Sequence, residues 1–152
     1  MKINKMTPDR IDRKILNLLL QDSRSSYRDI AKKVDVSVVT VMNRIKRLEA
    51  DGIIRQYTAF LDYDKIGYDI TVIVELRVEK GRLFQVEKRL AGIPNVVAVY
   101  DITGHFDVLV IAKFRNRKSL DVFLKQIQSY DFVQRTETKL VLNIMKERFL
   151  DI

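Results

Sequence analysis

The spacing of apolar residues changes once along this chain, near Gly52, and that change constrains the fold more than any other feature. Before Gly52, apolar residues recur at intervals of three and four, the period of an amphipathic helix. Over residues 70–78 they alternate with polar residues, the period of a strand buried on one face. A chain of 152 residues has room for two small domains. We therefore expect a helical domain with a linker strand over residues 1–61 and a second domain over 62–152.

Three helices are predicted in the first domain, and each has a recognisable start. Residues 7–8, Thr-Pro, are expected to open the first helix, Ser26 with Asp29 resembles a capping box for the second, and Ser37 is expected to cap the third. Gly52 is a natural stop for the third helix. The inward stripes of the three helices are Ile11, Ile15, Leu18 and Leu19, then Tyr27, Ile30, Ala31 and Val34, then Val38, Val41, Ile45 and Leu48.

The second and third helices are separated only by a short turn around residues 35–37, which is typical of a helix-turn-helix. The stripe of the third helix turns a set of polar and small side chains outward. Asparagine can pair with adenine, threonine and valine can contact a thymine methyl, and arginine and lysine can reach guanine or phosphate. Amides at the start of the second helix can hold a phosphate. The candidate DNA contacts are Ser26, Tyr27, Arg28, Ser37, Val39, Thr40, Asn43, Arg44, Lys46 and Arg47.

A basic amphipathic helix taken alone is more often simply solvated than bound to DNA. The three correctly spaced helices and the tight turn reverse that preference. The formal net charge of +8 also favours a polyanionic partner, and the basic excess is denser toward the N-terminus. The sequence therefore predicts double-stranded DNA as a partner.

The order of elements predicted after residue 66 is strand, helix, strand, strand, helix, strand. This is the ferredoxin-like βαββαβ arrangement, so the chain as a whole is expected to be α+β. The expected strands span 70–78, 96–103, 106–114 and 133–144, and the helices span 83–91 and the turns that carry Leu120, Phe123, Leu124 and Ile127. Both helices would cover one face of the sheet, and a second copy of the chain is the economical cover for the other face. Residues 53–61 have strand-forming side chains and are expected to pair across that dimer.

The composition disfavours an enzyme. Cysteine is absent, which removes disulfides, thiolate metal sites and cysteine nucleophiles, and His105 is the single histidine. We expect no catalytic residue, no metal site and no cofactor. No apolar stretch approaches the roughly 20 residues that span a bilayer, and the N-terminus lacks the apolar block of a signal peptide. The expectation is a cytoplasmic protein without a membrane partner.

Four segments resemble signatures of the Lrp/AsnC family, the leucine-responsive or feast/famine regulatory proteins of bacteria and archaea. They are DRIDRKIL at 9–16, SYRDIA at 26–31, VTVMNRIKRLEADGII at 39–54 and VYDITGHFD at 99–107. One departure is Pro8, which stands where the family usually has leucine. The resemblance covers nearly the whole chain. It implies a winged or near-winged helix-turn-helix, a linking strand, a βαββαβ effector domain, dimers through the effector sheets and often octamers.

The resemblance also implies an effector site, since family members bind amino acids or related metabolites where dimers meet. The corresponding positions here are Tyr100, Thr103, Gly104, His105, Asp107, Gln134, Thr136 and Thr138. Amides at Gly104 and His105 can bind a carboxylate, and Asp107 can meet an ammonium group. A Gly-His turn followed by Asp is also ordinary turn chemistry, and some relatives need no effector. His105 replaces an acidic residue that many relatives carry, so the ligand's identity stays open.

Three functions remain in view. The first is a sequence-specific transcription regulator whose dimers read two half-sites, with an effector that shifts either the assembly of dimers or the half-site spacing. The second is an architectural protein that coats DNA without an effector. The third is an enzyme similar to the sirohaem decarboxylases, which resemble this fold. A single histidine and the outward residues of the third helix disfavour the enzyme.

Overall fold

The computed structural model describes residues 7–148 and 150–152. The described chain divides into two units, one formed by residues 7–60 with 147, 148 and 150–152 and the other by 61–146. The first division lies beside the boundary expected from the sequence. The described residues after 146 group with the first unit, although they were expected to belong to the second. No helix in the described part of the chain combines the length and apolar character needed to cross a membrane.

The first unit contains three helices, α1 (Arg10–Gln21), α2 (Tyr27–Val34) and α3 (Val38–Ala50). Ser26 and Ser37 cap α2 and α3 as predicted, each accepting a hydrogen bond from the backbone amide three residues later. The predicted start of α1 at residues 7–8 is wrong, because the helix is capped by Asp9. Its carboxylate accepts the amides of Ile11 and Asp12, and the Asp12 carboxylate accepts the amide of Asp9.

The core of the first unit lies between the three helices. Its fully packed members are Ile15, Ile30, Ala31, Val34, Val41 and Ile45. Gly52 ends α3 as predicted, with φ +69°, a conformation that glycine adopts without steric cost. The amide of Ile53 then donates to the carbonyl of Leu48 at 2.9 Å. The unit therefore holds α2 and α3 in the relationship of a helix-turn-helix.

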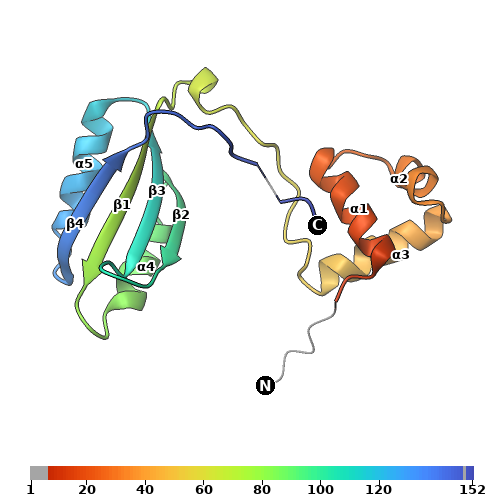
Figure 1. Cartoon of the computed structure of the whole chain (residues 1–152), viewed down its shortest axis with the longest axis horizontal. Helices are drawn as coiled ribbons and strands as arrows, with labels where there is room; N and C mark the ends of the chain where they lie inside the picture. Colours follow the sequence, from red (N-terminus) through yellow and green to blue (C-terminus); the bar gives the residue numbers. More distant parts are fainter. Residues whose placement is uncertain (1–6, 149) are drawn as a thin grey trace. The chain divides into compact units, whose positions relative to one another are not determined.

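The second unit has the element order that the sequence predicts, and the fold is α+β (Figure 1). Its elements are β1 (Ile70–Val78), α4 (Leu83–Ala91), β2 (Val96–Asp101), β3 (Val108–Phe114), α5 (Arg117–Gln128) and β4 (Val133–Leu140), preceded by a short 3₁₀ turn over Asp64–Ile66. The strands form one antiparallel sheet in the order β2-β3-β1-β4. Strands β2 and β4 are therefore the two edges of the sheet.

Three strand ends are shorter than expected. The strand predicted to end at residue 103 ends at Asp101, the one predicted to start at 106 starts at Val108, and the last ends at Leu140 and not at 144. The last strand stops because β1, the strand it pairs with, has no further residues to pair. The amide of Val141 makes the final ladder bond, to the carbonyl of Thr71 at 2.9 Å, and β1 begins at Ile70.

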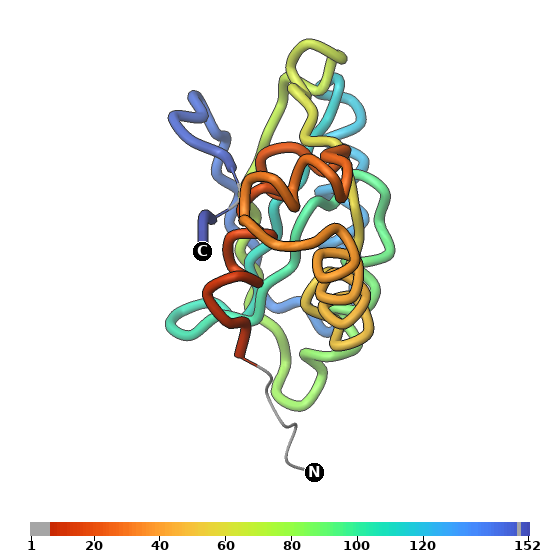
Figure 2. Tube along the Cα trace, turned by 90° about the vertical axis from the view of Figure 1, so that its right-hand side faces the viewer, coloured from red at the N-terminus to blue at the C-terminus, as the bar shows by residue number. Residues whose placement is uncertain are grey.

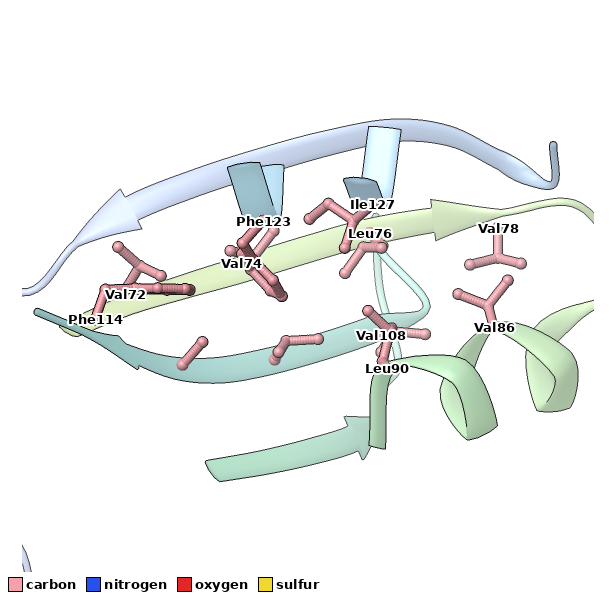
Figure 3. Close-up of a cluster of buried hydrophobic side chains, with 12 residues drawn as sticks. Val72, Val74, Leu76, Val78, Val86, Leu90, Val108, Phe114, Phe123 and Ile127 are labelled. Carbon is pink, nitrogen blue, oxygen red and sulfur yellow. The ribbon is translucent and has the colours of Figure 1, made fainter. Parts of the chain in front are cut away.

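The core of the second unit lies between one face of the sheet and both helices, as Figure 3 shows. Alternate residues of β1 and β3 enter it, and Val86 and Leu90 of α4 and Phe123 and Ile127 of α5 close it. The opposite face of the sheet has no helix in the described chain. Its central positions are Ile73 and Ile111, which pair across β1 and β3 and are only half-buried.

The structure assigns no strand to residues 53–61 of the single chain. These residues were expected to pair across a dimer. An extended segment without a partner strand cannot form a ladder, so that pairing stays a prediction.

Candidate nucleic-acid interface and effector site

Helix α3 presents a mixed apolar and polar face that is not part of the core. Val41, Ile45 and Leu48 are buried, whereas Asn43 and Lys46 on the other side are exposed. Val39 is 60% exposed, so its side chain is accessible to a partner surface. We define this set, Val39, Thr40, Asn43 and Lys46, as the reading face of α3.

A shallow hollow of about 320 Å³ lies on the same helix, lined by Thr40, Asn43, Arg44 and Arg47. The two arginines that line it also bind the carboxylates of Asp9 and Asp12 in α1. The Ser37 and Thr40 hydroxyls lie 2.8 Å apart, and the Ser37 hydroxyl also accepts the amide of Thr40. Ser37 therefore caps the helix, and its oxygen is engaged before any ligand arrives.

Arg44 and Arg47 make ion pairs with α1. Arg44 donates to Asp9 at 2.6 Å and to Asp12 at 2.8 Å, and Arg47 donates to Asp12 at 2.7 Å. Asp12 is 1% exposed, while the Arg44 and Arg47 side chains are 22% and 46% exposed. The hydrogen bond from Arg44 lowers the pKa of Asp9 from 3.8 to about 2 and raises the pKa of Arg44. Both arginines predicted to contact DNA thus also join α3 to α1.

The start of α2 carries the remaining three candidates. Tyr27 and Arg28 are exposed. The Ser26 hydroxyl donates to the Asp29 carboxylate at 2.6 Å while accepting the Asp29 amide at 3.1 Å. Because Asp29 already places a negative charge at this helix terminus, Arg28 is the better-placed phosphate contact of the three.

The predicted effector turn between β2 and β3 projects from the sheet as a loop (Figure 1, Figure 2). Thr103, Gly104 and His105 are exposed, and Gly104 has φ +119°. An arginine of β1 that the sequence analysis missed holds the turn: Arg77 donates to the carbonyl of His105 at 2.7 Å and approaches that of Gly104 at 3.4 Å. Carbonyls are thereby directed inward, toward β1.

Asp107 has a structural role in this turn. One of its carboxylate oxygens accepts the amide of Val78 at 2.8 Å and lies 3.7 Å from Nε of Arg77. An ammonium group meeting Asp107 would share this carboxylate with Arg77. No pattern in the sequence identifies Arg77 as the partner, since the contact joins β1 to a turn far away in the sequence.

The remaining effector candidates are not brought to one place within a single chain. Thr136 and Thr138 pair with Leu76 and Val74 of β1, so they lie on the face that α4 and α5 cover. Gln128 of α5 approaches the Thr136 hydroxyl at 3.4 Å. Tyr100 lies on β2, at the opposite edge of the sheet. Gln134 lies at the irregularity where β4 shifts register against β1.

The sequence analysis also missed Asp9 and Asp12. A signal for them exists, since Asp12 falls on the inward stripe of α1 with Ile15 and a carboxylate there needs a buried partner. The described residues contain no cluster of three or more His, Cys, Asp or Glu side chains suited to a metal ion.

Comparisons with known proteins match both units. Residues 8–55 match the family model described as winged helix-turn-helix DNA-binding, and residues 71–150 match the one described as Lrp/AsnC ligand binding domain. An HTH-type transcriptional regulator of Pyrococcus horikoshii is 47% identical over 144 residues, covering 95% of this chain and 97% of that protein.

Two solved structures share the fold over almost their whole length. Escherichia coli AsnC has a TM-score of 0.88 at 26% identity and covers 97% of this chain and 100% of its own. A transcriptional regulator of Neisseria meningitidis, solved as its L-Met complex, has a TM-score of 0.85 at 26% identity and covers 93% of this chain and 94% of its own.

Proposed function

Because the chain belongs to the Lrp/AsnC family of DNA-binding transcription regulators, we propose that it recognises a specific DNA sequence through the reading face of α3. The observation that carries this proposal is the exposure of Val39, Asn43 and Lys46 on a helix whose other side is packed in the core. A helix held in this way by a helix-turn-helix can enter the major groove with its N-terminal residues against the base edges.

Three members of the reading face have distinct chemical roles in this proposal. Asn43 pairs with an adenine edge through its amide, and Val39 contacts a thymine methyl. Lys46, together with Arg28 of the neighbouring helix α2, binds phosphate. These contacts set the position and affinity of the protein on DNA without reading the base sequence. Arg44 and Arg47 are secondary candidates, since any DNA contact they make competes with the carboxylates of α1.

The protein acts as a dimer in this proposal, with two copies of α3 on half-sites of a pseudo-palindrome. The supporting observation is the sheet face without helices, where Ile73 and Ile111 are half-buried. Sedimentation of the intact protein tests this. Ile111→Lys places a charge at the centre of that face and is expected to give monomers, whereas Lys125→Ala on exposed α5 leaves the dimer intact. Monomers in the unmodified protein would contradict the proposal.

We further propose an amino acid or related small metabolite as effector, bound where subunits meet. Support comes from the match to a ligand-binding domain and from a Neisseria meningitidis relative whose structure is titled an L-Met complex. The exposed turn at Thr103, Gly104 and His105 supplies amides suited to a carboxylate. The placement of Tyr100 and Thr136 at separate edges of one sheet fits a site completed by another subunit.

The effector part is tested by sedimentation during titration with the standard amino acids. An effector is expected to change the assembly of dimers, because it acts through different affinities for two states. Gly104→Ala is expected to weaken the response, since an L-residue is strained at φ +119°. No change in assembly or DNA affinity with any amino acid would overturn this part and leave DNA recognition standing.

Selection of genomic fragments by the purified protein tests DNA recognition. We expect a short motif, and we expect Asn43→Ala to relax one of its positions by about 1–3 kcal/mol. Lys46→Ala is expected to weaken binding to all sequences. It should also reduce the salt slope, the dependence of log binding constant on log salt concentration, by about one. Lys125→Ala, with the same charge change on α5, is the matched control. If no motif is enriched, and the intact protein and Asn43→Ala bind with the same salt dependence, the result would favour an architectural protein that coats DNA.

A further inference from the structure

The contact between α1 and α3 is a compact group of charges that DNA binding as proposed above does not use. Two carboxylates, Asp9 and Asp12, face two guanidinium groups, Arg44 and Arg47, within 2.6–2.8 Å. The four formal charges cancel. We name this group the α1–α3 charge cluster.

The cluster is anchored by a buried group. The Asp12 side chain is 1% exposed and accepts hydrogen bonds from Arg44, Arg47 and the amide of Asp9. A buried carboxylate that lost its cations would have no water to replace them, which makes its release strongly unfavourable. Breaking the bonds between Asp12 and the two arginines therefore costs free energy, so the arginines are expected to stay bound to it.

The cluster acts on both position and charge of α3. The two arginines lie one turn apart at Arg44 and Arg47, so their bonds to Asp12 resist rotation and sliding of α3 against α1. The same bonds engage both guanidinium groups with carboxylates of α1, although the two arginines line the same hollow as Thr40 and Asn43. Among the α3 side chains proposed to contact DNA, this leaves Lys46 as the cation that no carboxylate of the described residues pairs with.

We infer that Asp12 is a positioning residue for DNA recognition, which orients α3 and holds Arg44 and Arg47 back from DNA so that Val39, Thr40 and Asn43 determine the sequence preference. This inference rests on the proposed function of the reading face. It assigns specificity to a residue of α1 that lies in the core and touches no base. Free arginines bind any phosphate backbone, so their restraint lowers affinity for unrelated DNA more than affinity for the proper site.

The test compares full-length Asp12→Asn with the intact protein, on a selected fragment and on an unrelated fragment, across a salt series. Asparagine keeps the shape and the acceptor oxygen but removes the charge. We expect affinity for unrelated DNA to rise about fivefold at moderate salt, the salt slope to steepen by about one, and the ratio of specific to non-specific affinity to fall about tenfold. Asp121→Asn has the same charge change within an exposed α5 pair and is the control.

A charge-balanced variant separates positioning from mere destabilisation. Asp12→Asn combined with Arg47→Gln removes one cation for the one anion lost, and the salt slope is expected to return to that of the intact protein. If the steeper slope of Asp12→Asn came from a structural defect, the second substitution would not reverse it. If Asp12→Asn does not fold, Asp9→Asn replaces it, since Asp9 is exposed and contacts only Arg44 of α3; the expected changes have the same direction and smaller size.

The inference is overturned if folded Asp12→Asn matches Asp121→Asn in slope and in affinity ratio. Failure of the proposed function looks different. In that case the intact protein would bind both fragments equally, while the steeper slope of Asp12→Asn would still reveal arginines released to phosphate.

Discussion

At the scale of single residues, charged side chains make contacts between elements that the spacing of apolar residues does not predict. Asp12 sits on the core side of α1, and its neighbours Arg44 and Arg47 satisfy it from a helix more than thirty residues away. Arg77 plays the corresponding part in the second unit, where it ties the turn after β2 to β1. In both cases a charged side chain is partnered across elements. Asp12 is 1% exposed, so loss of its partners would leave a buried group unsatisfied, whereas the Arg77 side chain is 45% exposed.

We predict that Asp12→Ala destabilises the first unit by about 3 kcal/mol, because it leaves two guanidinium groups facing a cavity where a buried carboxylate had paired with them. Asp22→Ala removes an exposed carboxylate of the same unit and is expected to cost no more than about 0.5 kcal/mol. Urea unfolding followed by circular dichroism measures both. Equal midpoints for the two variants would show that the cluster does not stabilise the unit.

The Asp9 carboxyl gives a prediction of pH dependence. Its pKa in the folded protein is about 2, below the ordinary 3.8, chiefly because Arg44 donates to it. The stabilising contribution of this pair is therefore present above pH 3.8 and is lost as the pH falls through 2. Carboxyl-carbon NMR should give a midpoint near 2, and Arg44→Gln should move it up toward 3.8. A midpoint near 3.8 in the intact protein would rule out the pair in solution.

At the scale of elements, local capping chemistry accounts for where the helices of the first unit begin. Ser26, Ser37 and Asp9 each supply an acceptor for amides that the first turn leaves unpaired. The two serine caps follow from the sequence. The third was expected at residues 7–8, but a carboxylate at Asp9 that serves two amides is the stronger cap.

We predict that Ser37→Ala lowers the stability of the first unit by about 1 kcal/mol, since the amide of Thr40 loses its acceptor. Ser37→Thr keeps a hydroxyl at the cap and is expected to retain most of the stability. Thermal unfolding of the two variants makes the comparison. A loss in Ser37→Thr as large as in Ser37→Ala would assign the effect to packing and not to the cap.

At the scale of the whole molecule, the described chain contains two separate apolar cores. Ile45 lies in the core of the first unit and Leu76 in that of the second, and each is 0% exposed. Neither core shares a buried residue with the other. Each unit therefore has its own source of stability.

We predict two thermal transitions in the intact chain, each sensitive to one core. Ile45→Ala and Leu76→Ala should each cost about 3 kcal/mol, which corresponds to roughly 10–20 °C for a unit of this size. Scanning calorimetry of the full chain assigns the shifts: one transition should move in each variant. A single transition that moves equally in both would mean that the units unfold together.

Much of the fold follows from the sequence because period and capping are local properties. The alternation along 70–78 places Val72, Val74 and Leu76 on one face whatever the rest of the chain does. The helical stripe of α3 likewise exposes Val39 and Asn43, but Val38, which was expected to face inward, is 43% exposed. Strand ends were less predictable, because a strand ends where its partner does, and β4 is limited by the start of β1.

The sequence by itself determined the class of the fold, the helix-turn-helix and the outward side of its third helix, since these depend on residues a few positions apart. Only the tertiary structure decided which charges meet. It paired Arg44 and Arg47 with Asp12, directed Arg77 to the turn at His105, and put Tyr100 and Thr136 at opposite edges of the sheet. Long side chains can reach many partners, and only the packing of distant elements selects one of them.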